Sequence, residues 1–172
     1  MQTTQLIEET RRQILSFFGT NPNNHHLIFT SGCTASLKII GESFPWKFGP
    51  TESEQSCYYY LLENHNSVIG IREYAPHFKA IDLTDLTAII QNRHNDNLVS
   101  NDLQRNFELR NDPHCLLALP ACNNFSGQKI SFELIDRIKN KYPQLKILVD
   151  VAALVGTSKF DLSKWNGKRR YF

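Results

Sequence analysis

Apolar positions along the chain switch repeatedly between helical and strand-like spacing. Apolar side chains three to four positions apart, followed by Gly19 and Pro22, predict a first helix that ends near residue 18. Further helices are predicted over 34–43, 67–74, 83–91 and from a capping Ser131 to about Tyr142. Short apolar runs between the helices predict strands over 27–30, 58–62, 78–81, 116–119 and 145–149.

Strands that alternate with helices favour a parallel sheet with helices on both faces. The expected fold class is therefore α/β, a three-layer α/β/α arrangement around a mostly parallel sheet. The polar stretch 92–113 is expected to be a long surface excursion. We expect one partial domain over 1–165 and a divergent basic tail over 166–172.

Composition and charge narrow the function classes only slightly. The 172 residues carry a net charge of +2, and 41% are hydrophobic, as in ordinary globular domains. The basic cluster 168–170 is expected to be a solvated tail, with a nucleic-acid contact as the weaker alternative. No apolar run reaches the ~18 residues of a membrane span, and no signal peptide is visible at the start. We therefore expect neither a membrane nor a nucleic acid as partner.

The four cysteines, Cys33, Cys57, Cys115 and Cys122, form no CxxC pair. This pattern is typical of a reducing, cytoplasmic setting. Disulfides and a Cys/His zinc site are weaker alternatives, since the histidines are scattered and none is spaced from a cysteine as in zinc sites. No metal site is predicted.

The segment after the first predicted strand has the composition of an anion site. Gly32 permits a tight turn, and the free N–H groups of Cys33, Thr34 and Ala35 would point outward at a helix N-terminus, where an anion is favoured. The alternative is simple capping of the helix by a Ser or Thr side chain. In parallel sheets ligands sit beyond the carboxyl ends of the strands, where this segment lies.

Three further polar positions each follow a predicted strand. His65 can stack on an aromatic ring or move protons, or be an ordinary surface histidine. Asn123 and Asn124 can donate an amide hydrogen bond to a phenolate oxygen, or simply form an Asn-rich turn. Asp150 ends an apolar strand, where a carboxylate needs a partner. That partner can be a protonated pyridine nitrogen or the following turn.

In this order, the four features resemble the class V aminotransferase-like, fold-type I pyridoxal-phosphate enzymes, which include the cysteine desulfurases. Within that group the chain is most similar to the N-terminal domain of the molybdenum cofactor sulfurases. The stretches that carry the resemblance are 28–38 with Phe44-Pro45-Trp46, 65–73, 124–127, and 150–153 with Asp161-Leu162-Ser163. Asn-Phe-Ser-Gly and Phe-Pro-Trp favour the sulfurases over bacterial-type desulfurases.

The resemblance implies a role for each candidate residue. Cys33 and Thr34 match positions that hold the phosphate of pyridoxal 5′-phosphate, and His65 matches the ring-stacking histidine. Asn123 or Asn124 would reach the ring hydroxyl. Asp150 matches the acid that pairs with the ring nitrogen, which keeps the cofactor an electron sink.

The family reaction takes sulfur from L-cysteine and transfers it to the molybdenum cofactor of xanthine dehydrogenase and aldehyde oxidase-like enzymes. It needs a Schiff-base lysine and an acceptor cysteine, and the family places both later in the chain. Lys164 and Lys168 do not match that lysine segment. The expectation is a fragment truncated at both ends, with no catalytic residue of its own, no covalently held cofactor and no activity alone.

Other interpretations stay open at this stage. The chain can be a non-catalytic interaction module in a homodimer or in a mixed dimer with a longer relative, a fragment of a generic cysteine desulfurase or class V aminotransferase, or an enzyme that borrows its lysine from another chain. The resemblance also implies a partial transferase large domain with strand order 3-2-4-5, and strand 1 separated from strand 5 by a gap. Low solubility is expected from that gap.

Overall fold

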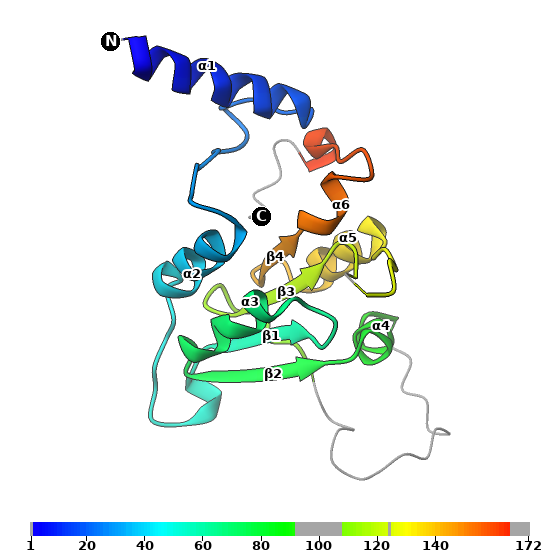
Figure 1. The fold of residues 1–172 in the computed structure, drawn as a ribbon. Helices are drawn as coiled ribbons and strands as arrows, with labels where there is room; N and C mark the ends of the chain where they lie inside the picture. The colour runs from blue at the N-terminus through cyan, green and yellow to red at the C-terminus, as the bar shows by residue number, and fades with distance from the viewer. Residues whose placement is uncertain (1, 92–107, 124, 166–172) are drawn as a thin grey trace.

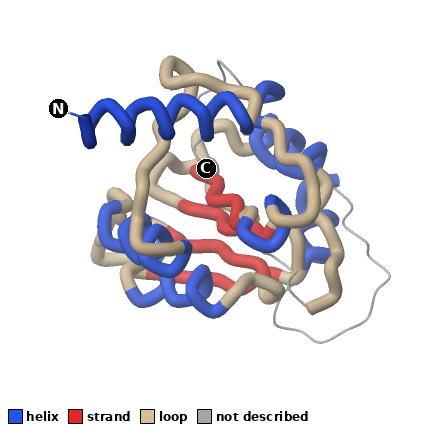
Figure 2. Tube along the Cα trace, turned by 45° about the horizontal axis from the view of Figure 1, so that its top comes forward, coloured by secondary structure: helices blue, strands red, loops and turns tan. Residues whose placement is uncertain are grey.

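A computed structural model describes residues 2–91, 108–123 and 125–165, and its centre is a parallel sheet (Figures 1 and 2). Four strands are hydrogen-bonded in the order β2-β1-β3-β4. Their bounds are β1 Cys57–Leu61, β2 His77–Ile81, β3 Leu116–Pro120 and β4 Lys146–Asp150. This confirms the expected order 3-2-4-5 for the second to fifth predicted strands.

The register brings the carboxyl ends of the strands to one edge of the sheet. Tyr58 pairs with Leu116 and Pro120 pairs with Asp150, all in parallel. β1 and β3 are buried along their whole length, as expected for central strands covered on both faces. Polar side chains that follow the strands therefore gather at this edge.

Helices cover both faces of the sheet, which confirms the three-layer arrangement. On one face α4 and α5 pack Leu86, Ile135 and Ile138 against the side of β1 that carries Tyr59. On the other face α2, α3 and a 3-10 helix pack against Tyr58. The helix bounds are α1 Gln2–Phe17, α2 Cys33–Ser43, α3 Asn66–Ile69, α4 Leu83–Gln91, α5 Phe132–Lys141 and α6 Ala152–Val155, with 3-10 helices Glu52–Glu54, Gly70–Glu73 and Leu162–Trp165.

The predicted elements agree closely with these bounds, with one helix divided. The predicted helix 67–74 is α3 followed directly by the 3-10 helix Gly70–Glu73. Ser131 caps α5 as predicted, because its Oγ accepts a hydrogen bond from the Glu133 N–H at 3.2 Å. Of the predicted surface excursion, 108–113 is irregular, whereas 92–107 and the basic tail lie outside the described residues.

The strand predicted over 27–30 is wrong, because the segment is an irregular connection between α1 and α2. Ile28 and Phe29 are 74% and 49% exposed. The segment pairs with no described strand and is held instead by Arg11, whose Nε donates to the Leu27 carbonyl at 2.9 Å. The Arg11 guanidinium also lies over the Phe29 ring, 5.5 Å from its centroid. An apolar run becomes a strand only where a free sheet edge is within reach.

α1 lies apart from the sheet at one end of the molecule (Figures 1 and 2). Its last turn is fixed by the segment after α6: the Leu162 N–H donates to the Phe18 carbonyl at 2.8 Å, and the rings of Phe18 and Phe160 meet edge to face. Leu15 is buried there, whereas Leu6, nearer the N-terminus, is 64% exposed. None of the described helices is long and apolar enough to span a membrane.

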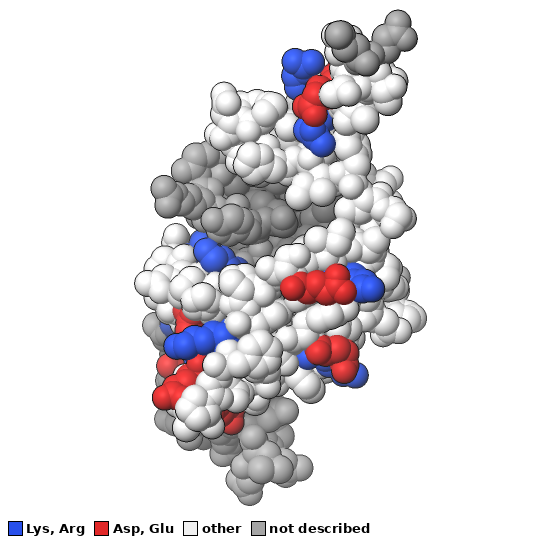
Figure 3. Space-filling view, turned by 90° about the vertical axis from the view of Figure 1, so that its left-hand side faces the viewer, with Lys and Arg blue, Asp and Glu red and all other residues white. Residues whose placement is uncertain are grey.

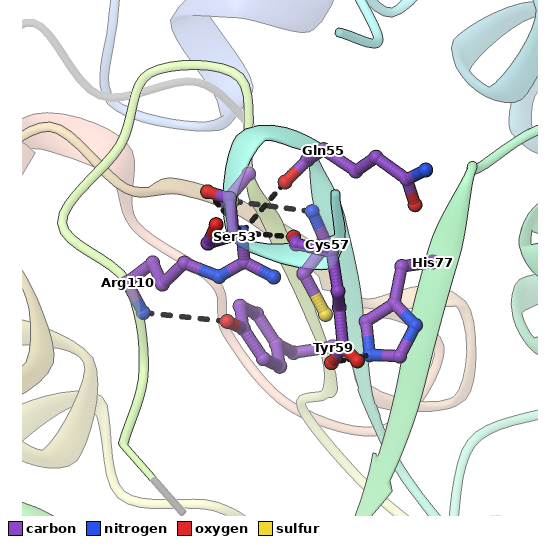
Figure 4. A network of polar contacts seen from close by, with 8 residues as sticks. Ser53, Gln55, Cys57, Tyr59, His77 and Arg110 are labelled. Atoms are coloured by element: carbon purple, nitrogen blue, oxygen red, sulfur yellow. Dashed lines mark hydrogen bonds and ion pairs between the residues drawn. The ribbon is translucent and has the colours of Figure 1, made fainter. Parts of the chain in front are cut away.

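A polar network closes the opposite, amino-terminal edge of the sheet (Figure 4). Nη1 of Arg110 donates to the carbonyls of Glu52, Ser53 and Gln55, and the Arg110 N–H donates to the Tyr59 hydroxyl at 3.4 Å. The Cys57 N–H donates to Cys115 Sγ at 3.2 Å. Burial raises the pKa of Cys57 to about 12, so this thiol is protonated at neutral pH and serves packing.

Candidate functional site

The start of α2 is an uncapped helix N-terminus. Gly32 occupies the N-cap position with φ 139°, and no side chain of the segment caps the helix. The alternative of Ser or Thr capping is therefore wrong: Thr30 Oγ1 instead pairs with Ser36 Oγ at 2.7 Å. A Cβ placed on Gly32 would meet no atom within 4 Å. Because no side chain caps the helix, its first-turn N–H groups are left without a side-chain acceptor, the arrangement that binds anions.

Two hydroxyl groups meet beside this helix start. Thr34 Oγ1 and Ser67 Oγ are 2.9 Å apart, which joins the first turn of α2 to the first turn of α3. Ser67 was missed by the sequence reasoning, although it belongs to the quoted segment 65–73. No local pattern marks its hydroxyl, because its position beside Thr34 depends on the packing of α3 against α2.

His65 lies exposed at the end of the β1 connection and caps α3. Its Nδ1 accepts a hydrogen bond from the Ser67 N–H at 3.2 Å. Because Nδ1 is the acceptor, the neutral ring carries its proton on Nε2. The cap orients the imidazole next to the Thr34–Ser67 pair, and stacking on a ring stays a prediction.

Asp150 lies half-buried at the end of β4, and one of its oxygens is used locally. Oδ1 accepts a hydrogen bond from the Ala152 N–H at 3.0 Å, so the carboxylate does cap the following turn. Oδ2 makes no hydrogen bond with the described residues. The pKa of the Cys33 thiol is raised by partial burial and, second, by the negative charge of Asp150. The start of α2 therefore lies close to the end of β4.

Asn123 lies in the loop that follows β3, and it organises that loop. Its Oδ1 accepts from the N–H groups of Phe125 at 2.8 Å and Ser126 at 3.1 Å, so the turn alternative is correct. With Oδ1 occupied, the amide Nδ2 remains as the donor that a ligand oxygen would require. Asn124 lies outside the described residues.

Asn64 is a buried polar residue that the sequence reasoning did not single out. Its Nδ2 donates to the carbonyls of Leu61 and Ala118, both at 3.0 Å, which ties the carboxyl end of β1 to the middle of β3. Its Oδ1 is buried and has no partner in the described part of the chain. A polar residue directly after an apolar strand was the available signal, the same one that marked Asp150.

The candidate residues form two linked groups. Thr34, Ser67 and His65 are joined by hydrogen bonds, and Cys33 is coupled to Asp150 through charge. The base of the Asn123 loop is bound to β4, because the Ala121 N–H donates to the Asp150 carbonyl at 2.8 Å. Within the described residues no hydrogen bond joins the side chains of His65, Asn123 and Asp150 directly. The site combines an open anion-binding helix end with a carboxylate.

This arrangement is matched by a known family. Residues 1–167 match the family described as aminotransferase class-V. The chain belongs to the aminotransferase class-V family. This match confirms the family that the sequence resembles.

Curated relatives of this class-V chain are molybdenum cofactor sulfurases. The protein of that name from Danio rerio is 36% identical over 172 residues, which cover 95% of this chain and 20% of the relative. The one from Solanum lycopersicum is 38% identical over 153 residues, which cover 81% of this chain and 18% of the relative. The chain therefore spans about a fifth of the length of these relatives.

Solved structures with a similar fold are NifS-like proteins and a cystine lyase. The NifS-like protein from Rickettsia africae has a TM-score of 0.64 at 20% identity, and the match covers 92% of this chain and 39% of that protein. The cystine C-S lyase C-DES in complex with cysteine persulfide has a TM-score of 0.66 at 17% identity, covering 94% and 40%. These matches confirm that the chain has the fold of part of a pyridoxal-phosphate fold-type I domain.

Proposed function

We propose that this chain forms the cofactor-binding part of a molybdenum cofactor sulfurase-like protein and binds pyridoxal 5′-phosphate. The single observation that carries the proposal is the uncapped start of α2, with open space at Gly32, lying beside the carboxylate of Asp150. A ligand with a phosphate at one end and a protonated ring nitrogen at the other has the matching charges.

The residues present fit this cofactor. The N–H groups of Cys33 and Thr34, together with the hydroxyls of Thr34 and Ser67, would hold the phosphate. Cys33 acts through its backbone, because its raised thiol pKa keeps the side chain protonated and uncharged next to an anion.

The ring would be held by side chains from three connections. Asp150 would accept from the protonated ring nitrogen through Oδ2, His65 would stack on the ring, and Asn123 or Asn124 would donate to the ring hydroxyl. When bound, the cofactor supplies an electron sink for chemistry at the substrate carbon atoms. Asp150 maintains that property by holding the proton on the ring nitrogen.

The proposed reaction is transfer of sulfur from L-cysteine to the molybdenum cofactor. It rests on the family and on the sulfurase relatives. We further propose that this chain alone binds the cofactor without a covalent bond and does not complete the reaction. In support, neither Lys164 nor Lys168 matches the lysine segment of the family.

Absorbance spectroscopy tests this proposal on the purified chain. Pyridoxal phosphate is added, the free cofactor is removed, and the spectrum is compared before and after borohydride. The proposal predicts that the chain retains the cofactor and that borohydride does not attach the cofactor covalently to the protein. It also predicts that no sulfide is released from L-cysteine. A cofactor that borohydride attaches to the protein, together with release of sulfide, would overturn the claim that the chain alone is inactive. No retained cofactor at all would overturn the binding part.

A non-catalytic interaction module is the second candidate, and the exposed apolar side chains favour it. Phe17, Ile28 and Phe48 are each more than 70% exposed. A homodimer or a mixed dimer with a longer sulfurase would cover such surface. A cytoplasmic setting is also part of the proposal, in keeping with four free cysteines.

A further inference from the structure

Glu63 carries a buried oxygen that the site described above does not use. Its Oε2 is inaccessible to solvent and has no hydrogen-bond partner among the described residues. Glu63 follows β1 by two positions and directly precedes Asn64. Leaving a carboxylate oxygen buried without a hydrogen bond costs on the order of 1–3 kcal/mol or more. Native structures therefore provide such oxygens with a donor.

Glu63 also lines a small pocket. Its volume is about 10 Å³, close to the smallest space that holds a single water molecule. Leu61, Leu83, Pro120 and Ile130 form its apolar walls, and Glu63, Asn123 and Gln128 contribute the polar ones. The pocket therefore spans the gap between the end of β1 and the loop that carries Asn123.

That loop is closed mainly on itself. Its base is held by the Ile130 N–H donating to the Ala121 carbonyl at 3.1 Å and by the Asn123 N–H donating to the Gln128 carbonyl at 2.9 Å. The sheet holds it at its start, where the Ala121 N–H donates to the Asp150 carbonyl. An additional bond on the β1 side would fix the direction of the Asn123 side chain.

We propose that Glu63 is a positioning residue for Asn123, acting through one water molecule bound in this pocket. The water donates to Glu63 Oε2 and accepts an N–H from the side-chain amide of Asn123, which keeps the second amide N–H for the ligand. Asn123 Oδ1 already accepts from the N–H groups of Phe125 and Ser126, so the amide nitrogen is the atom that would bind the water. The role given to Asn123 toward a ligand rests on the proposed function, whereas the anchoring of its loop does not.

The anchoring is tested without cofactor, by amide hydrogen exchange on the whole chain. Glu63→Leu removes the acceptor and fills the space, Glu63→Gln keeps an acceptor oxygen and the shape, and Glu9→Gln on the exposed surface of α1 is the matched control. The proposal predicts about tenfold faster exchange in a peptide covering 121–130 for Glu63→Leu, equivalent to about 1.4 kcal/mol. A smaller increase is expected for Glu63→Gln and none for Glu9→Gln, and β4 stays protected in all three.

Unchanged exchange of 121–130 in Glu63→Leu would overturn the proposal, provided that thermal melts show each variant folded. If Glu63→Leu does not fold, Glu63→Ala, which also removes the acceptor, decides instead: exchange of 121–130 equal to that of the unmodified chain would overturn the proposal. A crystal structure showing Oε2 bonded directly to an N–H, with no solvent in the pocket, would also overturn it.

Pyridoxal phosphate affinity separates this inference from the proposed function. If the unmodified chain binds the cofactor, Glu63→Leu should weaken binding several-fold and Glu63→Gln less. If the unmodified chain binds none, the proposed function fails, and the exchange data still decide whether Glu63 anchors the loop.

Discussion

At the residue scale, the polar side chains at the ends of the strands are stabilised by hydrogen bonds to nearby backbone groups. Asp150 is tolerated at the end of an apolar strand because the Ala152 N–H satisfies one oxygen. Asn64 is tolerated in the interior because it supplies donors to carbonyls of two strands. Both residues thus use part of their hydrogen-bonding capacity to hold the ends of strands in place.

Replacement of Asp150 should make Cys33 more reactive. The negative charge of Asp150 contributes to the raised pKa of the Cys33 thiol, so Asp150→Asn lowers that pKa and increases the thiolate fraction at pH 7.5. Alkylation of Cys33, followed by mass spectrometry, should be about two- to fivefold faster, because the thiolate is the reacting species and solvent screening limits the effect of a single charge. Asp161→Asn is the control, and equal rates for both variants would show that Asp150 does not act on Cys33.

Removal of the Asn64 amide should destabilise the fold. Asn64→Ala leaves the carbonyls of Leu61 and Ala118 without these donors, at a cost of about 1–3 kcal/mol in the free energy of unfolding measured in urea. Asn66→Ala, on the exposed surface two positions later, should change it by less than about 0.5 kcal/mol. Equal effects of both substitutions would contradict the bridging role of Asn64.

At the element scale, most helices and strands were predictable from apolar spacing and stop signals. The helix over 83–91 was predicted at its observed bounds, and the Ser131 cap was predicted correctly. The segment 27–30 was not predictable, since its apolar pattern is that of a strand, whereas Arg11 holds it as a connection through the Leu27 carbonyl and the Phe29 ring. The convergence of α2 and α3 at Thr34 and Ser67 depends on tertiary packing, which no local pattern shows.

The start of α2 depends on glycine for its backbone rather than for space. Gly32→Ala should lower the free energy of unfolding by about 1–3 kcal/mol, because φ is 139° although nothing lies within 4 Å of an added Cβ. Gly156→Ala is the matched control, with the same open surroundings but φ −77°, and should be neutral or slightly stabilising. Urea denaturation of both variants measures the difference, and a neutral Gly32→Ala would refute the backbone argument.

At the scale of the whole molecule, the surface combines dispersed charge with exposed apolar side chains. On the face shown in Figure 3, acidic and basic side chains lie next to one another. Lys38–Glu42 and Arg72–Glu73 are ion pairs between exposed side chains. β2 and β4 each pair with only one described strand, so the sheet has two open edges. A cleft of about 400 Å³ lies beside β4, lined by Ile40, Phe44 and Leu148 among others.

The isolated chain should therefore associate as its concentration rises. Open strand edges and apolar surface favour intermolecular contacts. Sedimentation velocity over a concentration series should show growing species, and Ile28→Ser combined with Phe17→Ser should reduce them. A monomer at every concentration, with a sharp and reversible melt, would contradict this expectation.

The central claim is that the start of α2 and Asp150 form the two ends of one cofactor site. The most direct test compares the affinities of pyridoxal phosphate and pyridoxal, by calorimetry, for the unmodified chain, Thr34→Ala with Ser67→Ala, and Asp150→Asn. The claim predicts that the phosphate improves affinity at least about tenfold in the unmodified chain, that the hydroxyl variant loses most of this advantage, and that Asp150→Asn weakens both ligands alike. Equal affinity for the two ligands in the unmodified chain would contradict the claim.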